Sequence, residues 1–280
     1  MRREFFLRTL WFKLWQVIGD VEEAGCGFRA AHAQKIRRTL TAKPMLADPL
    51  GQDASNAIRR LYQINRVETA TAVMSEFVLV PEGKTDFDWL SLLTRAVELE
   101  DKSDKTCLFG VRVGLISTSD AKVKETCEAL SKAHPHVCCL VDGDADGDRY
   151  VGQLRDPALG VHKVLRWPDG WTIENVVCWI LEAEEAVVMQ RVNADLAVRP
   201  GDRATLLARL KSQDRTQNGL KGDLVAYEII ANSLAGYPQC LGRARVMLHA
   251  IAQACASAAT QHFEVAVVGQ VPLLVFKPWP

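Results

Sequence analysis

Short apolar runs alternate with amphipathic stretches through the middle of the chain. Apolar runs bounded by turn residues are typical of buried strands, whereas apolar positions three or four residues apart are typical of helices. Four such runs occur, at SEFVLVPEG (75–83), VRVGLIS (111–117), HVCCLVDGD (136–144) and HKVLRWP (162–168). Strands that alternate with helices form parallel sheets through right-handed crossovers. The pattern therefore predicts an α/β fold, a Rossmann-like parallel sheet with helices on both faces.

Helical spacing fills the rest of the chain. The sequence predicts helices at 87–100 and 121–133, a short one at 150–156 and a long one at 172–192. The last 22 residues are either a strand that returns to the sheet or a terminal extension. The predicted organisation is an N-terminal helical segment (1–72), an α/β core (73–180), a C-terminal helical subdomain (181–258) and this tail (259–280).

Composition and charge argue against a strongly basic nucleic-acid-binding protein, a membrane-spanning protein and a zinc-binding or disulfide-rich protein. Thirty-four basic residues balance thirty-four acidic ones, so a polyanion would have to meet a local patch or bound cations. No stretch approaches the roughly 20 apolar residues that a membrane span needs, and residues 1–19 predict a basic amphipathic helix rather than a signal peptide. The eight cysteines show no C-x-x-C and no zinc-ligand spacing, which indicates buried thiols in a reducing cytoplasm.

Carboxylates follow two of the predicted strands. Glu82 ends the first apolar run, and Asp142 ends the third. Ligands of an open parallel sheet bind outside the carboxyl ends of its strands, so these two groups would share one crevice if the strands are neighbours. Like charges there are costly unless a divalent cation offsets them. Oxygen donors suit Mg²⁺ or Mn²⁺, and no His or Cys shares the spacing to favour zinc.

Other interpretations of this stretch stay open. DGDADG (142–147) matches the start of an EF-hand calcium loop, but the twelfth position is Gln153 instead of Glu, and a strand precedes it. A turn rich in Asp and Gly is the simplest alternative. Asp146 and Asp148 are expected to be turn or solvated residues.

The motifs resemble the Toprim domain. The resemblance lies in an apolar strand that ends in Glu-Gly-x-x-Asp (82–86), followed about 60 residues later by a strand that ends in Asp-x-Asp (142–144). It covers roughly residues 75–180. TIEN (172–175) and the lysine-bearing stretch GLKGDLVAYEIIANSL (219–234) are similar to the OLD (overcoming lysogenization defect) nucleases within the Toprim proteins.

The resemblance implies a two-metal DNA endonuclease that uses Mg²⁺ or Mn²⁺. Glu82 and Asp86 would hold one metal, and Asp142, Asp144 and Glu174 the other. Thr172 would assist nearby, and Lys221 would neutralise charge that develops on the phosphate. This division agrees with two-metal hydrolysis, which needs acidic ligands more than a basic residue.

Simpler interpretations apply to the helical positions. Asp86 and Glu174 fit the first turn of a helix, where the dipole favours carboxylates, and Thr172 fits a helix cap. Other basic residues are alternative candidates for the role of Lys221 in neutralising charge on the phosphate, namely Lys211, Arg215, Arg243 and Arg245. The basic residues of 203–221 and 243–245 would alternatively form a surface for the DNA backbone.

The chain also departs from the family it resembles. OLD proteins carry an ATPase domain with a phosphate-binding loop, and this chain has no G-x-x-x-x-G-K-[ST]. It therefore resembles the C-terminal region of such a protein, or a relative without the ATPase. The partners implied are DNA, a separate ATPase domain and, for one class, a UvrD-like helicase. The alternatives are another Toprim enzyme, such as a topoisomerase or primase, and a non-catalytic metal-binding module that forms a homodimer.

Overall fold

The structure is a computed structural model of the whole chain, and it describes residues 69, 72–73, 75–100, 108–132, 134–257 and 259–279. The helical segment predicted for residues 1–72 lies almost entirely outside the described residues. The predicted α/β core, helical subdomain and tail lie largely within them.

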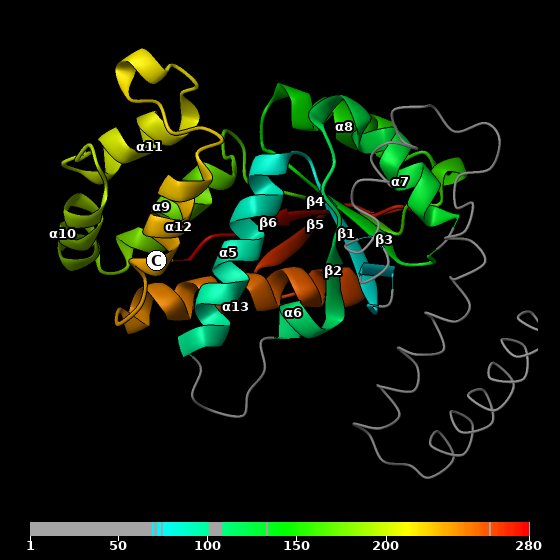
Figure 1. Cartoon of the computed structure of the whole chain (residues 1–280). Coiled ribbons are helices and arrows are strands. Elements are labelled where there is room, and N and C mark those ends of the chain that lie inside the picture. The colour runs from blue at the N-terminus through cyan, green and yellow to red at the C-terminus, as the bar shows by residue number, and fades with distance from the viewer. Residues whose placement is uncertain are drawn as a thin grey trace, which may run out of the picture.

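A six-stranded sheet forms the centre of the molecule (Figure 1). Its strands are β1 (Phe77–Pro81), β2 (Val113–Leu115), β3 (Val137–Val141), β4 (Lys163–Arg166), β5 (Phe263–Val267) and β6 (Leu273–Phe276). The order is β2-β1-β3-β4-β6-β5. Every neighbouring pair is parallel except β5 with β6. The predicted α/β fold is confirmed, with all four predicted strands in one mostly parallel sheet.

Helices connect the strands. The described ones are α5 (Lys84–Glu100), α6 (Leu108–Arg112), α7 (Val123–Ser131), α8 (Ala145–Leu154), α9 (Ile173–Glu182), α10 (Glu185–Asp195), α11 (Arg203–Lys211), α12 (Leu224–Asn232) and α13 (Pro238–Ala256). Short 3-10 turns lie at Asp120–Lys122, Pro157–Leu159 and Arg215–Gln217. The helices predicted at 87–100 and 121–133 are confirmed as α5 and α7. The short one begins earlier than predicted, at Ala145.

Alternate side chains of the central strands enter two separate cores. In β3, Cys139 and Val141 pack under α7 and α8, whereas Cys138 and Leu140 face the opposite side. A strand that is buried on both faces has no polar position to alternate with, which explains the unbroken apolar run VCCLV.

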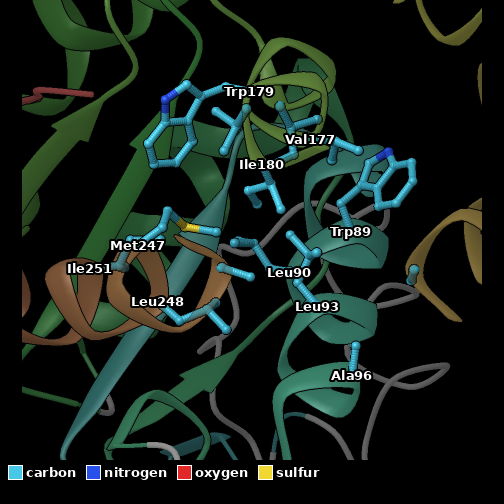
Figure 2. Close-up of a cluster of buried hydrophobic side chains, with 14 of the residues drawn as sticks. Trp89, Leu90, Leu93, Ala96, Val177, Trp179, Ile180, Met247, Leu248 and Ile251 are labelled. Atoms are coloured by element: carbon cyan, nitrogen blue, oxygen red, sulfur yellow. The ribbon is translucent and has the colours of Figure 1, made fainter. Parts of the chain in front are cut away.

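The larger core lies between the sheet and three helices from distant parts of the sequence. Figure 2 shows Leu90 and Leu93 of α5, Ile180 of α9, and Met247 and Leu248 of α13 converging there, all buried. The same core includes Phe276 of β6. The region predicted as a helical subdomain therefore shares one core with the sheet, while the exact domain boundaries stay predictions.

The predicted long helix at 172–192 was wrong, because the chain breaks between α9 and α10. At the break, Oε2 of Glu184 accepts hydrogen bonds from the backbone N–H groups of Gln239 (2.8 Å) and Cys240 (3.2 Å). These are among the amides that the first turn of α13 leaves without a partner inside the helix. The break places the carboxylate of Glu184 at the N-terminus of α13, which it caps.

The tail, which the sequence left open, is a hairpin that completes the sheet. β6 pairs in parallel with β4, and β5 forms the antiparallel edge. No helix among the described residues is long and apolar enough to cross a membrane. The six described cysteines are free and buried, as predicted.

Candidate metal centre

Glu82 and Asp142 lie side by side at the carboxyl edge of the sheet. β1 and β3 are neighbours, as the placement of the carboxylates required, with Pro81 opposite Leu140. The backbone N–H of Glu82 donates to the carbonyl of Leu140 (2.8 Å), and that of Asp142 donates to Oε2 of Glu82 (2.9 Å). The strand order reverses between β1 and β3, where ligands of open α/β sheets bind.

Gly143 brings the turn before α9 against this edge. Its N–H donates to the carbonyl of Trp171 (2.7 Å), and its carbonyl accepts from the N–H of Gly170 (2.6 Å). A Cβ on Gly143 would lie 1.7 Å from the carbonyl oxygen of Pro168, so only glycine allows this approach. This turn leads into α9, and Glu174 lies in the first turn of that helix.

Glu174 is buried in the first turn of α9, 3% exposed. The hydroxyl of Thr172 donates to Oε2 of Glu174 (2.6 Å), and the backbone N–H of Thr172 donates to the side-chain oxygen of Asn175 (3.0 Å). Thr172 is thus both the residue that begins the helix, as its simpler interpretation held, and a hydrogen-bond partner of the predicted ligand.

Asp86 and Asp144 occupy helix starts. Asp86 is buried in the first turn of α5. Asp144 is exposed and caps α8, with Oδ1 accepting from the N–H of Gly147 (2.9 Å). Helix N-termini favour negative charge, which helps to hold both carboxylates near the sheet edge.

The five carboxylates interact electrostatically at Asp142. Burial, followed by the charges of Asp86, Glu82, Glu174 and Asp144 in that order, raises the pKa of Asp142 to about 10. Its Oδ1 is buried and has no hydrogen-bond donor within the described residues. Every acidic residue that the sequence singled out as a ligand therefore interacts electrostatically with Asp142.

The donor set suits a hard divalent cation, since every donor is an oxygen. In the described part of the chain, no group of three or more His, Cys, Asp or Glu side chains is arranged so that it could hold a metal ion. Glu82, Asp144 and Glu174 each use one oxygen in a hydrogen bond with the protein. Binding of a metal would therefore require these side chains to rearrange, with one oxygen of each released from its present hydrogen bond.

The calcium-loop interpretation is wrong. Asp146 and Gln153, the fifth and twelfth loop positions, both lie inside α8. Asp146 pairs with Arg149 (3.1 Å), and Asp148 pairs with the buried Arg166 (2.9 Å). These two aspartates are exposed, as predicted, but belong to the first turn of a helix instead of a turn.

Lys221 lies in a turn and not in the helix that its sequence context suggested. α12 begins only at Leu224, because Asp223 caps it by accepting from the N–H of Ala226 (3.1 Å). Lys221 is exposed. Within the described residues, no ion pair engages the ammonium group of Lys221 or that of Lys211.

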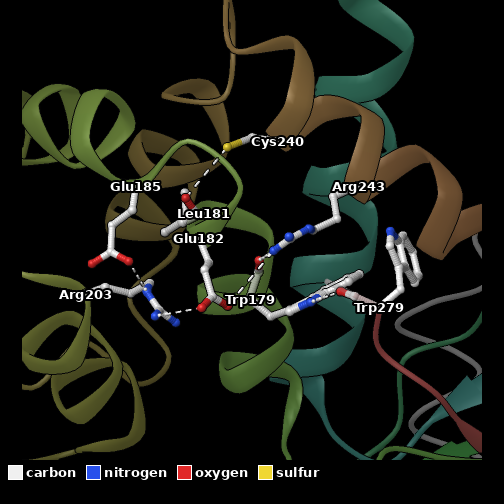
Figure 3. A network of polar contacts seen from close by, with 8 residues as sticks. All are labelled: Trp179, Leu181, Glu182, Glu185, Arg203, Cys240, Arg243 and Trp279. Atoms are coloured by element: carbon white, nitrogen blue, oxygen red, sulfur yellow. Dashed lines mark hydrogen bonds and ion pairs between the residues drawn. The ribbon is translucent and has the colours of Figure 1, made fainter.

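The arginines proposed as rivals or as a DNA surface have structural partners. In Figure 3, Arg243 donates to the carbonyl of Trp179 (2.6 Å) and Arg203 joins Glu182 and Glu185 (3.2 and 2.8 Å). Arg215 pairs with Asp223 (3.2 Å). These contacts leave Lys211 and Lys221 as the more available cations of the proposed set.

Two residues that join the segments of the candidate site were not singled out by the sequence. Gly143 had a signal in the D-G-D pattern, where glycine separates two carboxylates. Tyr227 accepts a hydrogen bond from the backbone N–H of Gly222 (2.6 Å) and stacks on Trp89. It had no signal, because Trp89 lies far from it in the sequence. No family model, no curated protein and no solved structure matched this chain in the comparisons with known proteins.

Proposed function

We propose that this protein is a DNA endonuclease that depends on Mg²⁺ or Mn²⁺. The observation that carries the proposal is the set of five carboxylates, from three segments of the chain, around Asp142 at the end of β3, where burial and the neighbouring charges raise the pKa of Asp142 to about 10. Such a cluster destabilises the fold unless a cation is bound. Its location at the switch point of the sheet is a place for ligands.

Glu82 and Asp86 would hold one cation, and Asp142, Asp144 and Glu174 the other. Two bound cations would supply an activated water and stabilise the leaving oxygen of a phosphodiester. The hydroxyl of Thr172 orients Glu174 through their 2.6 Å hydrogen bond. Residues on helix starts and strand ends give this site a rigid support.

A phosphodiester substrate also needs positive charge from the protein. The chain has no net charge, so local cations must meet the phosphates. Lys221 is exposed, has no ion pair in the described structure, and is joined through the next residue, Gly222, to Tyr227 (2.6 Å). We assign it the neutralisation of charge that develops on the phosphate, an effect worth about a hundredfold or more in rate for one such donor.

Cleavage of supercoiled plasmid tests the proposal. The protein should nick or linearise DNA with Mg²⁺ or Mn²⁺ and lose this activity in EDTA. Glu82→Gln and Asp142→Asn should abolish cleavage, whereas Asp146→Asn, a matched change of a neighbouring aspartate, should not. If both site variants cut at the wild-type rate, the proposal is wrong.

The alternatives predict other outcomes. A topoisomerase would need a reactive tyrosine. Tyr150 and Tyr227 are buried, Tyr237 is partly buried at the start of α13, and Tyr62 lies outside the described residues. A covalent adduct between protein and DNA would favour that class. Binding of metal without cleavage, by a stable dimer, would favour the non-catalytic module.

A further inference from the structure

Tyr227 connects the helix that carries Asp86 to the turn that carries Lys221. It is fully buried in α12, and its ring stacks on Trp89 of α5, with 4.4 Å between the ring centroids. Its hydroxyl accepts a hydrogen bond from the backbone N–H of Gly222 (2.6 Å). One side chain thus contacts both segments that the proposed reaction needs.

The hydroxyl of Tyr227 also lies within the field of the acidic cluster. Burial raises its pKa, and the charge of Glu174 raises it further, whereas hydrogen bonds with Gly222 and Thr85 lower it. Thr85 directly precedes Asp86 in the chain. The hydroxyl is thus joined to the lysine turn at Gly222 and to α5 at Thr85, and it interacts electrostatically with Glu174.

The turn is held from both sides. The N–H of Lys221 donates to the carbonyl of Ser212 (3.0 Å), and Arg215 donates to the carbonyl of Lys221 (3.3 Å). On the other side, Tyr227 accepts from Gly222, whose φ of 78° lies in the left-handed region that favours glycine. The backbone at Lys221 is therefore fixed, while its side chain is exposed.

We propose that Tyr227 is a positioning residue that fixes the turn at Gly222, so that the ammonium group of Lys221 is held beside the carboxylate cluster. The inference rests on the proposed nuclease function. Tyr227 acts through Lys221, because its own buried hydroxyl is already engaged by the protein. Tyr227 thereby connects the helix of a proposed metal ligand, Asp86, to the turn of Lys221. A lysine on a turn without this contact would not be held in one position.

Single-turnover cleavage of plasmid by Tyr227→Phe tests this role. The substitution keeps the stacked ring and removes one hydrogen bond, so the rate should fall about threefold to tenfold. Thermal unfolding and calorimetric titration with Mn²⁺ should stay close to wild type. Tyr237→Phe, which changes a partly buried tyrosine at the start of α13, serves as the matched control.

The Lys221→Ala background separates positioning from general support. Residues that act as a unit are not additive. Tyr227→Phe should therefore cause no further loss of rate once Lys221 is absent. A residue that only supported the fold would cause the same loss in both backgrounds.

Gly222→Ala moves the turn without changing Tyr227. A Cβ at Gly222 meets no atom within 4 Å, so the change acts through backbone strain alone. Gly236→Ala is a close match, since Gly236 has a φ of 84° and equally open space. We expect similar loss of stability from both and a loss of cleavage rate from Gly222→Ala only.

The outcomes are distinct. Full cleavage by Tyr227→Phe, or an equal loss with and without Lys221, overturns the positioning role while the nuclease function stands. A wild-type protein that cleaves nothing with either metal overturns the nuclease function and the positioning role with it.

Discussion

Two neighbouring strands each present an ionisable group at one end, Lys163 buried and Asp142 partly buried, and the surroundings of the two groups differ. Lys163 begins β4, whereas Asp142 directly follows β3. The ammonium of Lys163 donates to the carbonyls of Ala254 (3.0 Å), Cys255 (2.9 Å) and Ser257 (2.8 Å). Oδ1 of Asp142 has no donor among the described residues.

Their electrostatic surroundings differ in the same way. Lys163 lies at the carboxyl end of α13, where the helix dipole favours a cation. Asp142 is surrounded by four other carboxylates. Burial disfavours the charged form of both groups, lowering the pKa of Lys163 and raising that of Asp142. Three carbonyls offset this cost for Lys163, whereas like charges add to it at Asp142. The hydrogen bonds of Lys163 are satisfied within the protein, whereas those of Asp142 Oδ1 are not, which supports the proposal that the carboxyl edge of the sheet binds a cation.

Lys163→Met should have the largest effect on stability. Methionine keeps the apolar stem but removes three hydrogen bonds from a buried cation, so the free energy of unfolding should fall by about 3 kcal/mol. Urea unfolding of the metal-free protein measures this. Lys277→Met, at an exposed pair with Glu264, should change it by no more than about 0.5 kcal/mol. Equal effects of the two substitutions would break the contrast.

Gly143→Ala should damage the site more than the rest of the fold. Its Cβ would overlap the carbonyl of Pro168, so the turn before α9 must move and take Glu174 with it. We expect a loss of roughly 2 kcal/mol in stability, the usual scale for overpacking, together with loss of Mn²⁺ binding by calorimetry.

Gly152→Ala provides the control for this change. Gly152 lies in α8, and a Cβ there meets no atom within 4 Å. Alanine should stabilise the helix by about 0.5–1 kcal/mol and leave binding of metal unchanged. Normal binding of metal by Gly143→Ala would show that Glu174 is dispensable.

Asp142→Asn should stabilise the metal-free protein. The pKa of Asp142 is about 10 in the folded chain against an ordinary value of 3.8. Between these values the folded chain keeps a proton that the unfolded chain loses, so the free energy of unfolding falls as the pH rises from about 4 to about 10. Asparagine does not titrate, so this loss should disappear.

Thermal unfolding in EDTA measures the effect. At pH 8 the variant should unfold about 3 °C above wild type, which corresponds to roughly 1 kcal/mol for a chain of this size. With Mn²⁺ the order should reverse, because only the wild type gains stability by binding the metal. A variant less stable than wild type in EDTA at pH 8 would contradict the view that the fold without metal disfavours the carboxylate form of Asp142.

The sequence predicts that Glu82 and Asp142 lie together because each follows the end of a strand, and the structure places them side by side. An apolar run buried on both faces fixes where β1 and β3 end, and the parallel topology then brings Glu82 and Asp142 to one edge. The sequence did not predict the break at Glu184 or the turn at Lys221, because contacts with distant parts of the chain determine both. Glu184 caps a helix 55 residues later, and the lysine turn is held by Tyr227, which stacks on the distant Trp89. The local pattern of apolar and polar residues does not predict such contacts.

The smallest effect should come from Asp146→Asn, which tests where the site ends along α8. The side chains of Asp146 and Arg149 are 66% and 55% exposed, so their ion pair should contribute no more than about 0.5 kcal/mol. The cleavage rate of plasmid should stay within about twofold of wild type, the usual scale for a change at an exposed position. Asp144→Asn, two residues earlier, should abolish cleavage because Asp144 is a proposed ligand. If Asp146→Asn also abolished cleavage, the ligand set would extend into the helix, and the division between functional and solvated aspartates would have to move beyond Asp144.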